Sequence, residues 1–277
     1  MNRLKIKVLM DDESLDERFE KEHGLSLLIE HQLGSVLFDT GKTGAFIDNA
    51  RLMNADLSKV KHVVLSHGHY DHTGGLKTFL EFNRHAKIYF QINGSKQRFS
   101  QKEDGKVSYI GVGEDFPSGS RVTYTDTLFK INESMTLFSG VEGKHFVPSL
   151  NKSLFQQTDQ GFERDDFSDE QNLIIQENGK IALISGCSHK GILNIIDKAE
   201  EILHKPIDVV IGGFHLFNFT RHLMEDEKNI QSIIDYFQNR KTKIYVMHCT
   251  GTQPYDILKK ALQNRIEYKA AGTEIFL

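Results

Sequence analysis

Four apolar, β-type runs of this 277-residue sequence end in segments that carry histidine. These segments read HVVLSHGHYDH, IALISGCSH, DVVIGGFHL and KIYVMHC. Ligands of α/β proteins collect at the carboxyl ends of strands, because chain segments converge there into a crevice. The pattern therefore predicts an α/β fold whose functional side chains gather at strand ends.

The order of the other elements predicts the sheet arrangement. Early β-type runs read as hairpin-connected antiparallel pairs, whereas later ones alternate with helical patterns over 74–83, 191–204, 225–238 and 254–264. This order predicts one mixed sheet, or two sheets, with outer helices. The polar, glycine-punctuated stretch 94–169 predicts loops or an insertion that covers a site. Because no linker is rich in Pro, Gly or Ser, we expect residues 1–277 to form a single domain.

Composition excludes several classes of protein. The net charge is −4 and no basic cluster is present, which argues against a nucleic-acid partner. No apolar run approaches the roughly 20 residues of a membrane span. The first residues become acidic before the apolar core of a signal peptide could form. The two cysteines, Cys187 and Cys249, exclude a disulfide framework and fit a reducing compartment, so we expect a cytoplasmic protein.

The segment SHGHYDHTGGL predicts a metal site. Side chains two residues apart in an extended segment point the same way, so His67 and His69 can bind one cation. Asp71 and His72 follow on the next turn and suit a second cation. Neutral imidazole and carboxylate are ligands for zinc, iron or manganese. The alternative is a polar loop with incidental histidines.

The residues after the motif predict local backbone features. Thr73 is expected to be the N-cap of the following helix. Gly74 and Gly75 are expected to let the backbone pass close to the metals.

The same motif resembles the HxHxDH signature of the metallo-β-lactamase superfamily. Further similarity lies in LFDTGKTGAFIDNA, GCSHKGILNII, VVIGGFHL and HCTG, which span 37–251. These pieces resemble a narrower branch that includes the archaeal dihydropterin–ribofuranosylaminobenzene-phosphate synthases and bacterial relatives. The resemblance implies an αββα sandwich, with two mixed β-sheets, outer helices and one or two metals at the rim.

The resemblance also implies a ligand set. His67 and His69 correspond to the first metal position, Asp71 and His72 to the second, and His248 to the last histidine of the superfamily. The centre departs from the common form, because Gly186-Cys187 stands where many members have Gly-Asp. We expect His189 to be a ligand, whereas Cys187 is either a thiolate ligand or a small buried residue. The usual separate third histidine is not evident, and His145 reads as a surface or lid residue.

Other residues receive weaker predictions. Asp39 is expected to hydrogen-bond a ligand histidine, with a plain turn aspartate as the alternative. His215 is expected to line the pocket or to bind metal, and it shares the catalytic prediction with Asp71. Phe214 and Arg221 are predicted to bind substrate. They belong to an expected aromatic wall with a cationic end, formed by Phe214, Phe217 and Phe219 beside Arg221 and His222; the alternative is that the phenylalanines fill the core. Histidines without supporting context read as surface or helix-end residues, namely His23, His31, His62, His85 and His204.

The predicted function is that of a metal-dependent enzyme with one or two divalent ions, zinc first, with iron or manganese as alternatives. The leading hypothesis is hydrolysis of a small phosphorylated or heteroaromatic ester-type substrate by a metal-activated water. Resemblance to the narrower branch gives an alternative, transfer of a pterin-methyl group with displacement of pyrophosphate. A non-catalytic metal-containing ligand-binding or sensor protein is the alternative of another class. The expected partner is a small, phosphorylated or pterin-like molecule, without nucleic acid or membrane.

Overall fold

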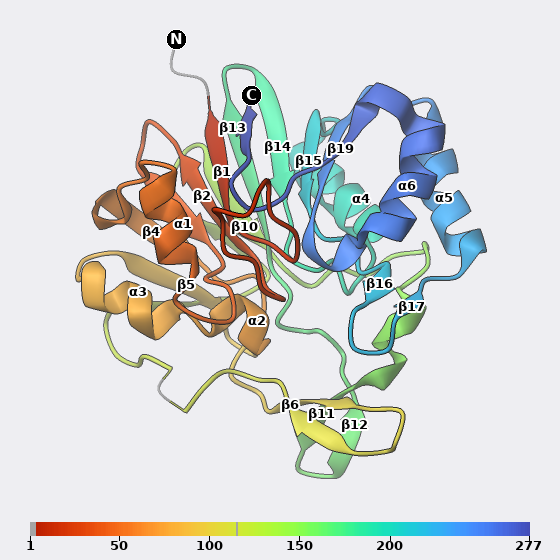
Figure 1. Ribbon diagram of the computed structural model, residues 1–277, viewed down its shortest axis with the longest axis horizontal. Helices are drawn as coiled ribbons and strands as arrows, with labels where there is room; N and C mark the ends of the chain where they lie inside the picture. The colour runs from red at the N-terminus through yellow and green to blue at the C-terminus, as the bar shows by residue number, and fades with distance from the viewer. Residues whose placement is uncertain (1–3, 115) are drawn as a thin grey trace. The chain divides into compact units, whose positions relative to one another are not determined.

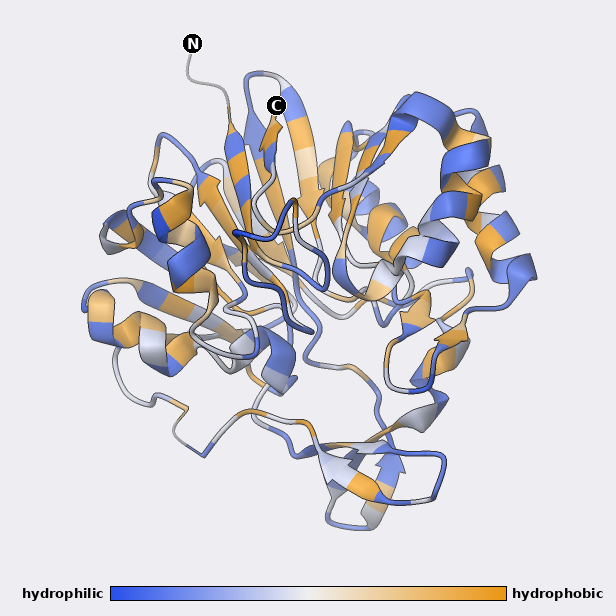
Figure 2. Cartoon of the chain, in the orientation of Figure 1, coloured by the Kyte–Doolittle hydropathy of each residue, from blue (hydrophilic) through white to orange (hydrophobic). Residues whose placement is uncertain are grey.

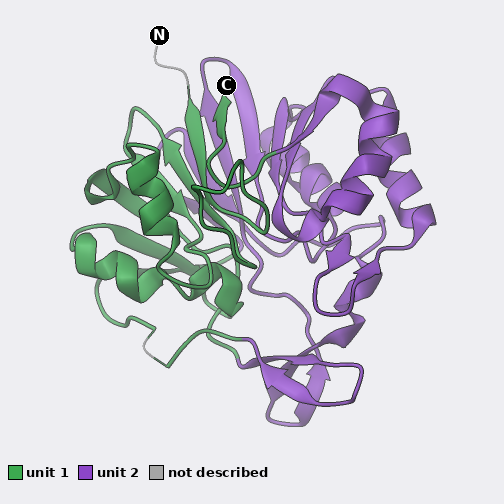
Figure 3. Cartoon of the chain, in the orientation of Figure 1, with its two compact units in different colours: residues 1–96, 111–126, 269–277 green, residues 97–110, 127–268 purple. Residues whose placement is uncertain are grey.

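Two seven-stranded sheets organise residues 4–114 and 116–277, which are the residues that the computed structural model describes. Each sheet belongs to one of two units (Figure 3). Unit 1 contains residues 1–96, 111–126 and 269–277, and unit 2 contains residues 97–110 and 127–268. The expectation that residues 1–277 form one domain stays a prediction.

The sheet of unit 1 is mixed, with the strand order β20-β1-β2-β3-β4-β5-β8. Neighbours from β20 to β3 pair antiparallel, and those from β3 to β8 pair parallel. The parallel half directs the carboxyl ends of β3 and β4 to the same edge. The elements of unit 1 are β1 (Lys5–Met10), β2 (Ser26–Glu30), β3 (Ser35–Phe38), α1 (Phe46–Leu52), η1 (Leu57–Lys59), β4 (Val60–Val64), α2 (Tyr70–Thr73), α3 (Leu76–Phe82), β5 (Lys87–Gln91), β8 (Val122–Thr125) and β20 (Glu274–Phe276).

An apolar core joins this sheet to α1 and α3, which lie beside it in Figure 1. Helix α1 contributes Phe46 and Ala50, four residues apart and therefore on one helical face. Helix α3 contributes Leu76 and Phe79, which are three residues apart. Their partners from the strands are Leu9, Met10, Leu28, Leu37, Val63, Ile88, Phe90 and Val122.

The sheet of unit 2 is also mixed, with the order β19-β18-β15-β14-β13-β10-β9. The hairpin between β13 and β14 turns at Asn178 and Gly179, with φ of 52° and 75°, as the Asn-Gly pair predicts. Strands β14, β15, β18 and β19 are parallel. The elements of this sheet and its helices are β9 (Leu128–Lys130), β10 (Met135–Phe138), η2 (Ser149–Ser153), β13 (Asn172–Glu177), β14 (Lys180–Ile184), α4 (Ile192–Leu203), β15 (Val209–Gly212), β16 (Phe217–Asn218), β17 (Leu223–Met224), α5 (Glu227–Gln238), β18 (Lys243–Val246), η3 (His248–Thr250), α6 (Thr252–Leu262), η4 (Gln263–Arg265) and β19 (Ile266–Tyr268).

Helices α4, α5 and α6 share an apolar core with this sheet, and Figure 2 shows their apolar stripes beside hydrophilic outer faces. The helical patterns predicted over 191–204, 225–238 and 254–264 correspond to these three helices. The longest of them, α4 and α5, have 12 residues each. Throughout the described ranges, no helix combines the length and the apolar character needed to cross a membrane.

The middle of the chain contains more strands than the sequence indicates. Unit 2 has a four-stranded antiparallel sheet, β12-β11-β6-β7, formed by β6 (Arg98–Gln101), β7 (Val107–Tyr109), β11 (Leu154–Thr158) and β12 (Gly161–Arg164). Its strands are only three to five residues long and mix polar with aromatic residues. Such short polar strands lack the apolar run or clean alternation that identifies a strand in sequence. Their expected role as a cover over a site stays a prediction.

Candidate metal centre

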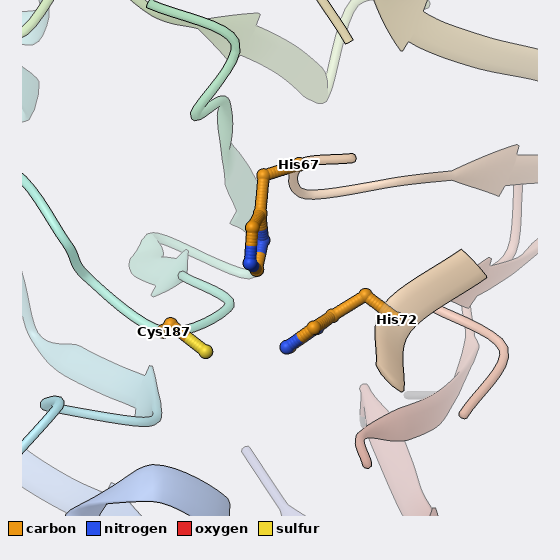
Figure 4. Close-up of side chains that lie close together, drawn as sticks. All are labelled: His67, His72 and Cys187. Carbon is orange, nitrogen blue, oxygen red and sulfur yellow. The ribbon is translucent and has the colours of Figure 1, made fainter. Parts of the chain in front are cut away.

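In unit 1, the loop between β4 and α3 buries four potential ligands. The exposed fraction is 0% for His67 and His72, 5% for His69 and 6% for Asp71. Nε2 of His67 lies 3.0 Å from Nδ1 of His69, and the rings of His67 and His72 have centroids 4.2 Å apart. Figure 4 shows the rings of His67, from the loop after β4, and His72, from α2. Two imidazoles on one zinc ion, each with a Zn–N bond of about 2.0–2.1 Å, place their nitrogens roughly 3 Å apart. The His67–His69 pair therefore has the spacing of two ligands of one cation.

Asp39 and Ser66 orient these imidazoles. The Asp39 carboxylate accepts from the Ser66 backbone N–H and hydroxyl, both at 2.7 Å, and lies 2.6 Å from Nδ1 of His72. Because the single Ser66 hydroxyl proton goes to Asp39, Ser66 Oγ accepts from Nδ1 of His67 at 2.9 Å. Both histidines then carry a proton at Nδ1, which leaves Nε2 as the nitrogen that a metal could bind. The predicted hydrogen bond of Asp39 to a histidine of the motif is confirmed at His72, whereas Ser66 was not identified from sequence.

The charge around His72 favours its protonated form in the absence of metal. Burial opposes a charged imidazolium, but the carboxylates of Asp71 and Asp39 outweigh burial and raise the pKa of His72 to about 9. Asp71 Oδ2 lies 3.4 Å from Nε2 of His72 and 3.5 Å from Nε2 of His23. A divalent cation on Nε2 of His72 would lie beside the Asp71 carboxylate, whereas Asp39 faces Nδ1 on the other side of the ring.

His23 makes specific contacts beside the motif, whereas an ordinary surface residue is expected from sequence. Its Nδ1 lies 2.6 Å from Asp12 and its Nε2 3.5 Å from Asp71, although 38% of its side chain is exposed. No sequence pattern indicates this pair, because Asp12 and His23 lie far from the motif along the chain.

The backbone after the motif differs from the predicted cap. Thr73 is the last residue of α2, and its hydroxyl donates to the carbonyl of His69 at 3.1 Å. Helix α3 has Gly75 as its N-cap, so the Thr73 prediction is wrong; α2 takes up the residues that were expected to lead into a single helix. A Cβ at Gly74 would lie 2.1 Å from the Lys42 carbonyl oxygen, and one at Gly75 2.1 Å from that of Thr40. The glycines therefore allow close packing against the backbone that follows β3.

In unit 2, three adjacent parallel strands end in the other predicted residues. Cys187 and His189 follow β14, Phe214 and His215 follow β15, and His248 follows β18. Cys187 appears on its loop in Figure 4. His215 and His248 have φ of 49° and 51°, a left-handed region that few residues other than glycine adopt. Such strained positions cluster at functional sites because surrounding structure must hold them.

His189 is held on three sides. Asn151 Oδ1 lies 2.9 Å from its Nδ1, and Asn151 Nδ2 donates to its carbonyl at 2.8 Å. Because the Asn151 amide nitrogen donates to that carbonyl, its oxygen accepts from Nδ1–H, which places the His189 lone pair on Nε2. The Phe167 ring stacks on the imidazole with 4.3 Å between centroids and an interplanar angle of 7°. Glu170 accepts from the backbone N–H of His189 at 2.5 Å. No sequence pattern indicates Asn151, Phe167 or Glu170 as partners of His189.

The remaining donors of unit 2 form soft ligand groups. One donor atom each from Cys187, His189 and His215 lies within 4.8 Å of the others, and the same holds for Cys187, His248 and Cys249. Cys187 and Cys249 are each only 3% exposed. Burial opposes ionisation of Cys249, but a hydrogen bond with Cys187 and the charges of His248 and His215 outweigh it and hold the pKa of Cys249 well below its usual value. Thiolate sulfur with imidazole nitrogen suits zinc or iron, so the donor set fits a transition metal.

The predicted substrate-binding residues occupy different environments. Phe214 is 1% exposed and belongs to the apolar core of unit 2, which agrees with the alternative that it fills the core. Phe217 and Phe219 are half-buried, in an edge-to-face contact. Arg221 donates to the Gln101 carbonyl at 2.7 Å. His145 Nε2 lies 3.0 Å from Asp197 Oδ2, and a quarter of the His145 side chain is exposed.

Comparison with known proteins identifies the superfamily. Residues 20–133 match the model of the metallo-beta-lactamase superfamily. Uncharacterized protein MJ0448 of Methanocaldococcus jannaschii is 31% identical over 252 residues, which cover 89% of this chain and 90% of the relative. The 7,8-dihydropterin-6-methyl-4-(beta-D-ribofuranosyl)-aminobenzene-5'-phosphate synthase of the same organism is 26% identical over 98% of this chain and 96% of its own.

A solved structure gives the same result for the fold. Tm1679, described as a metal-dependent hydrolase of the beta-lactamase superfamily, is 30% identical, covers 99% of both chains and has a TM-score of 0.82. The predicted α/β fold with two mixed sheets and helices is confirmed, and it matches the sandwich fold of this superfamily. On these similarities, the chain belongs to the metallo-beta-lactamase superfamily.

Proposed function

We propose that this protein is a metal-dependent hydrolase of a small ester or phosphoester. The proposed ligands of its one or two divalent cations are His67, His69, Asp71, His72, Cys187, His189 and His248. The observation that carries the proposal is the orientation of the imidazoles: Asp39, Ser66 and Asn151 fix the Nδ1–H tautomer of His72, His67 and His189. Hydrogen bonds of this kind accompany metal-binding histidines because they set ring orientation and raise ligand basicity.

The bound metal would supply an acidified water and a Lewis acid for a carbonyl or phosphoryl oxygen. The residues of the chain have separate proposed tasks. Asp71, only 6% exposed and close to His72, adds negative charge where a cation would lie. His215, half-buried beside Cys249, is placed to line the pocket or to exchange a proton with substrate.

The first test is metal content together with turnover. We expect elemental analysis of the purified protein to give about one to two transition-metal ions per chain. His69→Ala should lose metal and hydrolysis of a phosphodiester, ester and lactone panel while keeping its far-UV circular dichroism, because the ligand loop contributes little to the apolar core. His85→Ala, which removes an exposed histidine, is the matched control. Full metal content in His69→Ala would reject the ligand assignment, and metal without turnover of any substrate would favour the non-catalytic alternative.

The similarity to the dihydropterin synthase supports a second candidate. That relative covers nearly the whole chain at 26% identity. The corresponding reaction would join a pterin-methyl group to an arylamine nitrogen, with departure of pyrophosphate. Incubation with a pterin-methyl diphosphate separates the two functions. Pyrophosphate release that requires an arylamine supports transfer, whereas release without one supports hydrolysis.

A further inference from the structure

Arg98, at the start of β6, forms a buried charged group with two aspartates of unit 2. Its Nε lies 3.2 Å from Asp165 Oδ2, and its terminal Nη2 lies 2.7 Å from Asp169 Oδ1. All three side chains have an exposed fraction of 0%. Buried charges are costly unless they are paired, so this guanidinium strongly favours the arrangement that brings both carboxylates to it.

The two aspartates bracket a tight turn. Asp165 Oδ1 accepts from the backbone N–H of Phe167 at 2.9 Å, and the Phe167 carbonyl accepts from the N–H of Glu170 at 3.1 Å. Phe167 has a φ of 48°, which is unfavourable for a bulky residue and persists only where neighbouring contacts hold it. Because Arg98 fixes the residues on either side of Phe167, it is placed to maintain this conformation.

The turn contacts His189 through both its ring and its backbone. Phe167 covers one face of the imidazole in a parallel stack. The Glu170 carboxylate receives the backbone N–H groups of His189 and Lys190, at 2.5 and 2.9 Å. A displacement of the 165–170 turn would therefore release the ring stack and the backbone anchor together.

We propose that Arg98 is a positioning residue for His189, acting through the 165–170 turn. A guanidinium presents several donors in a fixed plane and can serve two carboxylates, whereas a lysine ammonium is a point charge on a flexible stem. A lysine at position 98, which keeps the positive charge, is therefore not expected to hold both aspartates in place. The consequence for metal binding rests on the proposed function, in which His189 is a ligand. The effect of Arg98 on the orientation of the His189 ring does not depend on that function.

The test compares variants of the metal-free full chain by NMR of the His189 ring protons, assigned by their loss in His189→Gln. The Phe167 ring current shifts these protons away from the positions of an unstacked histidine. Arg98→Met and Arg98→Lys should move them toward those positions. Arg164→Met is the matched control, because Arg164 belongs to the same small sheet but lies over the Phe155 ring on an exposed surface. It should leave the His189 signals unchanged.

Metal affinity provides the second readout. Competition with a chromophoric chelator should show roughly 10–100-fold weaker zinc binding in Arg98→Lys and no change in Arg164→Met. If Arg98→Met does not fold, the His189 ring-proton shifts of Arg98→Lys and Asp169→Asn test the positioning role. Unchanged His189 signals in folded Arg98 or Asp169 variants would overturn the positioning role. Unchanged zinc binding in His189→Gln would instead refute the ligand assignment while leaving the NMR result to decide the role of Arg98.

Discussion

The protonation of His72 predicts how the metal-free protein responds to pH. The folded pKa of about 9 lies above the ordinary value of 6.5, because the charges of Asp71 and Asp39 outweigh burial. A difference of this size corresponds to about 3 kcal/mol of stability. The contribution is complete below pH 6.5, where the folded and unfolded chains are both protonated. It is lost progressively as the pH rises from 6.5 through 9, because over this range the unfolded chain has released the proton that the folded chain still holds.

Urea unfolding with a chelator present, at pH 6 and at pH 9.5, measures this loss. Asp39→Asn keeps the shape of the side chain but removes one carboxylate from His72, so the variant should lose less unfolding free energy across the same interval. Asp48→Asn, which alters an exposed aspartate paired with Arg51 on α1, controls for a general change of charge. Equal losses in the wild-type chain and Asp39→Asn would refute the proposed electrostatic coupling.

Two further predictions concern the packing and the thiols around the candidate ligands. Gly75→Ala places a Cβ 2.1 Å from the Thr40 carbonyl oxygen and 2.3 Å from that of Thr43, so thermal unfolding should show a loss of about 1–3 kcal/mol. Gly113→Ala, with no atom within 4 Å of its Cβ, should lose less. If Cys187 is a ligand, bound metal should slow its alkylation and chelation should restore it, with mass spectrometry reporting Cys187 and Cys249 separately. Equal rates for Cys187 with and without metal, together with full metal content in Cys187→Ser, would leave His189 as the proposed ligand from that loop.

The sequence predicted the parts of the site that are local along the chain. The motif from His67 to His72 follows a strand directly, so its spacing alone indicates a metal site, with His67 and His69 on one cation and Asp71 and His72 suited to a second. The apolar runs before Cys187, His215 and His248 likewise indicate strand ends, which the structure confirms as adjacent and parallel. These inferences needed only periodicity and the order of residues.

The orienting residues could not be predicted in the same way. Asn151 contacts His189 from 38 residues away, and Arg98, on β6, contacts two aspartates of the segment between β12 and β13. Neither lies in a sequence pattern typical of metal sites, because their partners are chosen by tertiary packing. Thr73 shows a different kind of error, because here a local sequence signal was misleading. A residue typical of N-caps ends α2, and α3 follows it at once.

The left-handed backbone at His215 and His248 has a consequence for evolution and engineering of this chain. A non-glycine residue in such a conformation costs on the order of 1–3 kcal/mol, which glycine at the same position would relieve. Backbone strain alone would therefore favour glycine at these two positions, whereas selection for the proposed metal chemistry would retain the imidazoles. At these strand ends of unit 2, substitutions that raise stability are therefore expected to weaken the proposed function.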